Sequence, residues 1–323
     1  MRTKTNISDE SDRLAIKVCR LFYKEHLTKT EIEKRLHISR FKVARILEAA
    51  QKSGLVRIEI QEPYRDLSEM ESELESKLGL KSALLVGDDG ESLKELKEKA
   101  GRLAAEYLSS ILRKGDVMGI GWGSTTYELV NAIPPSASKQ VRIVQVSGGN
   151  TSFESGIDSQ ALTMRIARKF GVEPYLLHAP TLVDRPETRE ALMQESAFRQ
   201  IFEMYQKVNI LVAGIGAFLP NGFQGTLFLG DAEISTLRDH GAVGEFLSYC
   251  YDIHGDMSQT DRLTRIIAIP PENIKKVPYS IGIAVGYEKA AAILGAIRAG
   301  LVNTLITDTT TARVLFKEPK TQA

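Results

Sequence analysis

Cysteine and long hydrophobic runs are scarce in this chain, and both shortages narrow the class of protein. Its two cysteines, Cys19 and Cys250, are too few and too far apart for a disulfide framework or a zinc site. The longest apolar run, Ile210 to Leu219, is too short and too glycine-rich to span a bilayer, and the polar start of the chain lacks the apolar core of a signal peptide. We therefore expect a cytoplasmic protein that has no contact with membranes.

The chain also lacks a strong net charge, because 42 lysines and arginines face 41 acidic residues. These charges are unevenly distributed: residues 1–65 hold 15 basic and 9 acidic side chains, which leaves 27 and 32 for the remaining residues. A basic head on an acidic body is expected when one part meets nucleic-acid phosphates and the other does not. We expect two domains, a DNA-binding domain at residues 1–62 and a larger domain at residues 63–323.

Residues 27–56 have the pattern of a helix-turn-helix unit. A first helix is expected at residues 12–25, a second begins near Thr28 or Thr30, and a third is capped by Ser39. The apolar residues that would close the small core are Leu27, Ile32, Leu36, Ile38, Val43, Ile46, Leu47, Leu55 and Val56.

The side chains expected to face DNA lie on the second and third helices. One set, expected to hold phosphates, comprises Lys29, Thr30, Lys34 and Arg35. A second set, at the helix start that meets base edges in the major groove, comprises Ser39, Arg40, Phe41, Lys42 and Arg45. For any single lysine a solvated helix face is an equal alternative, but the segment as a whole favours DNA. Residues 55–60 then alternate apolar and charged side chains, which predicts a short strand or wing.

From residue 82 onward, short apolar strands alternate with longer amphipathic helices. The expected strands lie at residues 83–86, 116–120, 141–146, 175–177, 208–214, 281–285 and 305–307. The expected helices lie at residues 93–112, 125–132, 162–170 and 290–299, with a last one starting near Asp308. This alternation predicts an α/β fold with a doubly wound, mostly parallel sheet that carries helices on both faces.

An acidic segment, residues 66–80, precedes this region and carries an apolar seam at helical spacing. The seam consists of Leu67, Met70, Leu74 and Leu78. It would suit either a dimerising helix or the first helix of the larger domain. We favour packing on the larger domain, because the seam is too short for a stable coiled coil.

Three loops that follow predicted strands are rich in glycine: residues 119–126 (GIGWGSTT), 147–150 (SGGN) and 214–216 (GIG). In a parallel sheet such loops border the ligand crevice, and the free amides at the start of a following helix attract anions. The candidate ligand-binding residues are Gly121, Gly123, Ser124, Thr125, Ser147, Gly148, Gly149, Asn150, Gly214 and Gly216. The GxxxxGK[ST] and GxGxxG spacings are missing, so we expect an anionic small molecule and no nucleotide cofactor.

Two charged residues and one tryptophan stand out in the larger domain. Asp252 interrupts an apolar segment, and it either accepts hydrogen bonds from a ligand or caps a strand end. Lys289 falls at a predicted helix start, where the helix dipole disfavours a cation, so a nearby anion explains it better than solvent does. Trp122 either stacks against a ligand or packs its loop on the sheet. Residues 252–256 offer Asp, His and Asp without a further ligand, so no metal site is expected.

Taken together, these motifs resemble the SorC-type family of sugar-binding transcriptional regulators over nearly the whole chain. The head is similar in LTKTEIEKRLHISRFKVARIL and GLVRIEI, and the ligand loops are similar in GIGWGSTT, VSGGN and LVAGIG. The stretches LSYCYDIHG and YSIGIA, and Gly286 with Lys289, also follow the family pattern. The resemblance implies a body related in fold to sugar-phosphate isomerases and deaminases. It also implies a phosphorylated sugar effector, operator DNA as a partner, and a dimer or tetramer.

The resemblance further implies roles for individual residues. Those that would hold the phosphate and nearby oxygens of the ligand are Gly121, Gly123, Ser124, Thr125, Ser147, Gly148 and Gly149. Asp252 would accept hydrogen bonds from sugar hydroxyls, and Lys289 would reach the ligand from the start of a late helix. Some relatives carry a lysine where Ser147 stands, which could form an imine with a carbonyl ligand. Serine cannot do so, and binding is therefore expected to be noncovalent there.

Two functions fit this pattern. The first is a ligand-responsive repressor of carbohydrate genes that acts as a homo-oligomer on operator DNA. The alternative is a sugar-phosphate isomerase or deaminase fused to a DNA-binding head. That chemistry needs a positioned acid and base, and beyond Asp252 the sequence offers no convincing second group. Kinship of fold does not confer activity, so we expect a regulator that is not an enzyme.

Overall fold

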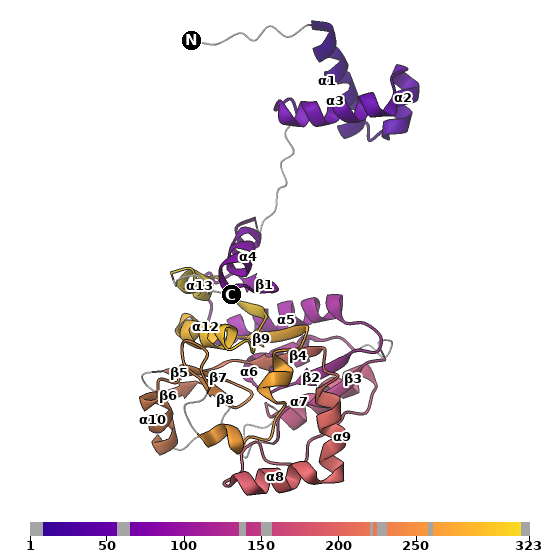
Figure 1. Ribbon diagram of the computed structural model, residues 1–323. Helices are drawn as coiled ribbons and strands as arrows, with labels where there is room; N and C mark the ends of the chain where they lie inside the picture. Colours follow the sequence, from indigo (N-terminus) through magenta and orange to yellow (C-terminus); the bar gives the residue numbers. More distant parts are fainter. Residues whose placement is uncertain are drawn as a thin grey trace. The chain divides into compact units, whose positions relative to one another are not determined.

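The computed structural model describes residues 9–56, 65–135, 140–149, 157–219, 222–224, 231–257 and 261–317. The chain divides into two compact units, Met1–Pro63 and Tyr64–Ala323 (Figure 1). The boundary expected between residues 62 and 63 lies outside the described residues.

The first unit, here called the head, has three helices around one small core. They are α1 (Asp9–Tyr23), α2 (Lys29–Leu36) and α3 (Arg40–Lys52). Thr28 caps α2 through a capping box with Glu31, and the Ser39 hydroxyl accepts a hydrogen bond from the amide of Lys42 at the start of α3. Both caps confirm the expected helix starts. The expected strand or wing at residues 55–60 lies largely outside the described residues.

The second unit, here called the body, is built on a parallel sheet, as expected. Among the described residues its strand order is β1-β10-β9-β4-β2-β3, with every neighbouring pair parallel. The strands are β1 (Ser82–Val86), β2 (Val117–Ile120), β3 (Arg142–Gln145), β4 (Ile210–Gly214), β9 (Tyr279–Ile283) and β10 (Thr304–Asp308).

Helices cover both faces of this sheet, which confirms the doubly wound fold (Figure 1). One face carries α5 (Leu93–Ile111), α6 (Ser124–Ala132) and α7 (Ser159–Phe170). The other carries α4 (Arg65–Leu78), α9 (Ser196–Tyr205), α12 (Ala290–Arg298) and α13 (Thr309–Leu315). Successive strand residues serve opposite faces: Ile210 joins the first cluster and Leu211 the second.

Helix α4 closes one edge of the sheet. Its seam residues Leu74 and Leu78 are buried in the body's core, which confirms the favoured packing. The Glu75 carboxylate accepts a hydrogen bond from the amide of Ala83 (2.9 Å), and another α4 glutamate accepts one from Leu85 (2.8 Å). These amides belong to the edge strand β1, so α4 occupies donors that would otherwise pair with another strand.

The body also contains elements that the sequence did not indicate. They are helices and the strands of a small antiparallel sheet, whose order among the described residues is β6-β5-β7-β8. These elements are α8 (Pro186–Gln194), β5 (Gly216–Leu219), β6 (Gly222–Gln224), α10 (Asp231–Asp239), β7 (Gly244–Phe246), β8 (Tyr249–Tyr251) and α11 (Pro271–Ile274). The strand expected at residues 175–177 is wrong, because Tyr175 makes only an isolated bridge to Val144.

The packing of α4 generates a stability prediction. Leu74→Ala removes a fully buried side chain, so it should lower the free energy of unfolding of the body by about 2–5 kcal/mol. Glu73→Ala, at an exposed position of the same helix, should change it by less than about 0.5 kcal/mol. Urea denaturation measures both values. Equal effects would contradict the packing described here.

Candidate functional site

The chain leaves two neighbouring strands of the parallel sheet in opposite directions. From β2 it proceeds to β3 at one edge, whereas from β4 it proceeds to β9 and β10 towards the other edge. Strands β2 and β4 therefore flank a topological switch point, where α/β sheets open a crevice at the carboxyl ends of their strands. Two of the three glycine loops, residues 121–123 and 214–216, begin at this point.

Glycines let these two loops pack backbone against backbone. A Cβ atom on Gly123, whose φ is 131°, would lie 3.3 Å from the Cα of Gly214. The amide of Gly214 donates a hydrogen bond to the carbonyl of Trp122 at 3.1 Å. A Cβ on Gly121 would lie 2.4 Å from the side chain of Leu247, which comes from the small sheet. Close packing thus accounts for all three glycines.

The start of α6 lies at this switch point, and the amides of its first turn are unpaired within the helix. Gly123 is the N-cap and provides no side-chain acceptor, so the amides of the first turn have no intrahelical partner. The Thr125 hydroxyl donates to the carbonyl of Ile283 at 2.9 Å, and that of Thr126 donates to Trp122 at 3.2 Å. The half-buried Ser124 is the remaining hydroxyl of this turn. The turn can therefore bind an anion through backbone amides and Ser124.

The second glycine loop is engaged in internal contacts. The amides of Gly148 and Gly149 donate to the carbonyls of Ile267 (3.0 Å) and Ala179 (2.7 Å). The fully buried Ser147 hydroxyl lies 3.5 Å from the hydroxyl of Thr181. These contacts connect the loop after β3 to residues 179–181 and to Ile267. A ligand role for Ser147, Gly148 and Gly149 stays a prediction, and Asn150 lies outside the described residues.

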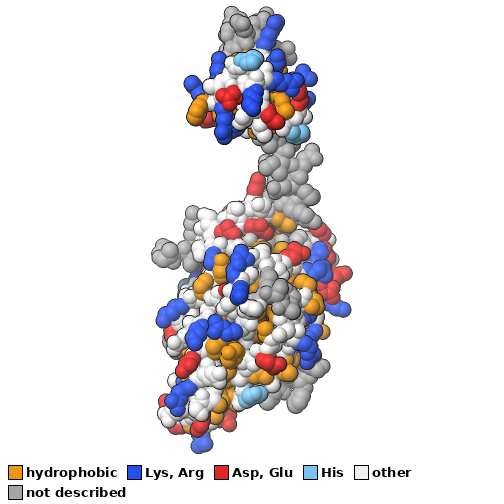
Figure 2. Space-filling model, turned by 90° about the vertical axis from the view of Figure 1, so that its right-hand side faces the viewer, with side chains coloured by type: hydrophobic (Ala, Val, Ile, Leu, Met, Phe, Trp, Pro, Cys, Tyr) orange, Lys and Arg blue, Asp and Glu red, His pale blue; other side chains and the backbone are white. Residues whose placement is uncertain are grey.

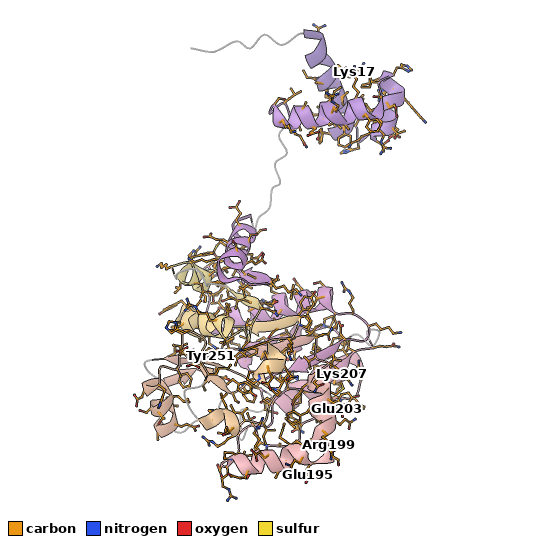
Figure 3. The ribbon with its side chains drawn as sticks, in the orientation of Figure 1. Lys17, Glu195, Arg199, Glu203, Lys207 and Tyr251 are labelled. Carbon is orange, nitrogen blue, oxygen red and sulfur yellow. The ribbon has the colours of Figure 1, made fainter. Side chains whose placement is uncertain are left out.

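A buried glutamate that the sequence analysis missed lies beside the first loop. Glu245 is on β7 and only 1% exposed, and its carboxylate accepts a hydrogen bond from the amide of Ser248 at 2.9 Å. The turn from β7 to β8 has positive φ at Leu247 (53°) and Ser248 (73°), which L-residues adopt at a cost of about 1 kcal/mol or more each. This strained hairpin, which ends at Tyr251 (Figure 3), fixes the position of the carboxylate.

Lys289 lies in a 3₁₀ turn (Tyr287–Lys289) directly before α12, and its ammonium donates to the carbonyl of Ile215 at 2.6 Å. Burial, reinforced by repulsion from Lys97, lowers the pKa of Lys289 to about 8, while Glu245 acts in the opposite direction. Lys289 therefore reaches the third glycine loop, and its burial disfavours the charged form of the ammonium.

Burial favours the neutral form of Glu245, as it does for Lys289. Burial raises the pKa of Glu245, and the Ser248 amide, the charge of Lys289 and the Trp122 indole lower it in part. Trp122 itself packs among Leu237, Ala242 and Cys250, which favours the packing alternative. Its indole N–H interacts with the carboxylate of Glu245. The switch point thus brings a buried carboxylate and the Trp122 indole close together.

Asp252 is occupied by its own turn. Its Oδ1 accepts hydrogen bonds from the amides of His254 and Asp256, both at 2.8 Å. These contacts support the capping alternative for Asp252. The carboxylate that lies beside the first glycine loop is that of Glu245. One signal for Glu245 was available, since it is the single acid within the otherwise uncharged stretch 241–251.

In the head, the residues expected to contact DNA lie on the surface. Val43, Leu47 and Ala50 turn into the core, whereas Ser39, Arg40, Phe41, Lys42 and Arg45 are exposed. Figure 2 shows Lys and Arg side chains over the visible surface of the head. Thr30 is exposed and Lys29 half-buried. Arg35 forms an ion pair with Glu25 (2.9 Å), which competes with a phosphate contact.

Among the described residues, no cluster of three or more His, Cys, Asp or Glu side chains could hold a metal ion. None of the helices described is long and apolar enough to cross a membrane.

Known proteins are similar to this chain over nearly its whole length. Residues 62–317 match the family model described as "Putative sugar-binding domain". The sorbitol operon regulator of Klebsiella pneumoniae is 32% identical over 94% of this chain and 98% of its own length. The deoxyribonucleoside regulator of Bacillus subtilis is 28% identical over 96% and 99%.

A solved structure agrees with these sequence matches. The crystal structure of the full-length sorbitol operon regulator SorC from Klebsiella pneumoniae superposes with a TM-score of 0.73 at 31% identity, covering 95% of this chain and 99% of that one. The similarity thus spans both the head and the body. The chain belongs to the SorC-type family of sugar-binding transcriptional regulators.

Proposed function

We propose that the body binds a phosphorylated sugar or polyol in the crevice at the β2/β4 switch point. The observation that carries this proposal is the combination of an uncapped α6 N-terminus with the buried Glu245 and the half-buried Lys289. The amides of α6 and Ser124 would hold the phosphate, because helix N-termini offer free donors and a positive potential. Glu245 would accept hydrogen bonds from sugar hydroxyls. Lys289 would neutralise part of the ligand's charge.

The names of the relatives support a polyhydroxylated ligand. One is called a sorbitol operon regulator and another a deoxyribonucleoside regulator. Neither name fixes the ligand of this chain. The phosphate is inferred from the α6 N-terminus and Lys289, which no neutral polyol would require.

The head, on this proposal, represses carbohydrate genes by binding an operator with repeated half-sites in the cytoplasm. A homo-oligomer supplies two or more heads, so a ligand that favours one arrangement of the bodies changes the affinity for DNA. Such coupling is typically about 1–3 kcal/mol. We also propose that the body does not turn its ligand over, since its relatives are named as regulators.

A thermal-shift screen of the full chain against sugars, polyols and their phosphates tests this function. A ligand that binds only the native state raises the melting temperature as its concentration rises. We expect a phosphorylated compound to give the largest shift, to remain intact, and to change the affinity for DNA. A hit that is consumed during incubation would instead indicate an isomerase or deaminase.

The carboxylate of Glu245 generates a binding prediction. Glu245→Gln keeps an acceptor for the Ser248 amide but removes the charge, so affinity for the screened ligand should fall by about tenfold or more. Glu203→Gln, at an exposed position of α9 labelled in Figure 3, should leave the affinity unchanged. Isothermal titration calorimetry measures both, and equal affinities for the two variants would refute the role of Glu245.

The lowered pKa of Lys289 predicts a pH dependence. The ammonium is charged below a pH of about 8, and an anionic ligand favours that charged form. Affinity should therefore be highest below a pH of about 8 and should fall as the pH rises through this value. The ligand's phosphate, with a second pKa of about 6, no longer titrates in this pH range. Lys289→Met should bind more weakly and show a flatter profile. An unaltered profile in this variant would assign the titration to another group.

The head generates a prediction with two separable outcomes. Arg40→Ala should relax sequence preference by about 1–3 kcal/mol, because on this proposal it removes a group that reads a base edge. Lys29→Ala should weaken binding to all DNA alike and reduce the salt dependence by about one counterion. Fluorescence anisotropy at several salt concentrations distinguishes the two. Equal loss by Arg40→Ala on selected and random DNA would contradict the first assignment.

A further inference from the structure

Phe41 is an aromatic side chain left almost entirely in water. It is 84% exposed, whereas the other large apolar side chains that lie exposed among the described residues reach at most 58%. It is the second residue of α3, and the Ser39 cap fixes the helix start directly before it. The apolar surface of this ring is unfavourably hydrated, and its position at a well-defined helix start leaves it accessible to a binding partner.

The surroundings of the ring restrict what that partner can be. Arg40 and Lys42 flank Phe41, and Arg45 lies one turn further along the same face. The opposite face of α3 is filled by the head's own core. An apolar protein surface placed over Phe41 would have to desolvate these neighbouring cations, which is unfavourable without paired anions. A polyanion that also offers an apolar group meets both requirements.

The major groove of DNA offers one apolar group, the C5-methyl of thymine, next to phosphates that attract the neighbouring cations. We propose that the ring of Phe41 packs against a thymine methyl group and makes a thymine at that position part of the operator. This inference rests on the proposed DNA-binding function of the head. Phe41 distinguishes thymine from cytosine, which lacks the methyl group, while the flanking cations contact phosphates or guanine.

The experiment removes the methyl group and nothing else. The full-length protein selects a duplex from a random DNA pool, and each thymine of that duplex is then replaced singly by deoxyuridine, which keeps every hydrogen-bonding group. We expect roughly fourfold weaker binding at one or two positions per half-site, the loss that corresponds to one buried methyl group. In Phe41→Ala the same replacements should change affinity less than about 1.5-fold, since the partner of the methyl is gone.

Two further variants and a stability measurement serve as controls. Phe41→Ala should not lower the melting temperature, because the ring is exposed in the folded head. Phe41→Leu should keep part of the methyl dependence. Ile16→Ala, which removes another exposed apolar side chain of the head from α1, should keep all of it.

The outcomes separate this inference from the function on which it rests. Specific binding without any methyl dependence, or methyl dependence that persists in Phe41→Ala, would overturn the assignment of Phe41 and leave the head a DNA-binding unit. A change of oligomeric state in Phe41→Ala with unaltered methyl dependence would assign the ring to a protein contact. Failure to bind any DNA would overturn the proposed function itself.

Discussion

The close approach of two backbone loops organises the body. Gly123 and Gly214 let the loops after β2 and β4 touch at the switch point, and Gly121 lets Leu247 of the β7–β8 turn lie on the first loop. A side chain at these points would separate the loops or push the small sheet away. The start of α6, the buried Glu245 and Lys289 depend on this contact for their relative positions, so the geometry of the crevice follows from the absence of three side chains.

Burial acts against the charged forms of both ionisable groups at the switch point. Burial raises the pKa of Glu245 and lowers that of Lys289, which means that each group is less stable in its charged form than it would be in water. A ligand that carries an anion and several hydroxyls relieves both. In the head it is an apolar ring that is exposed to solvent, because Phe41 lies on the surface between cationic neighbours. DNA offers both phosphates for the cations and thymine methyl groups for the ring.

The sequence predicted the features that rest on periodicity or on local capping. The Ser39 cap, the parallel strands and the packing of Leu74 follow from patterns within a few residues, and all are confirmed. The antiparallel strands escaped notice because they are three or four residues long and mostly buried, so they show no alternation. Gly148 looks like a ligand residue in sequence, yet its amide is bound to Ile267, a contact that only the fold reveals.

The central claim is that one ligand bridges the start of α6 and the carboxylate of Glu245. The most direct measurement is a crystal structure of the protein with a compound that the thermal-shift screen identifies. The account predicts phosphate oxygens within hydrogen-bonding distance of the α6 first-turn amides, with a ligand hydroxyl against Glu245. A ligand bound away from the β2/β4 switch point, or one that leaves Glu245 without a contact, would contradict it.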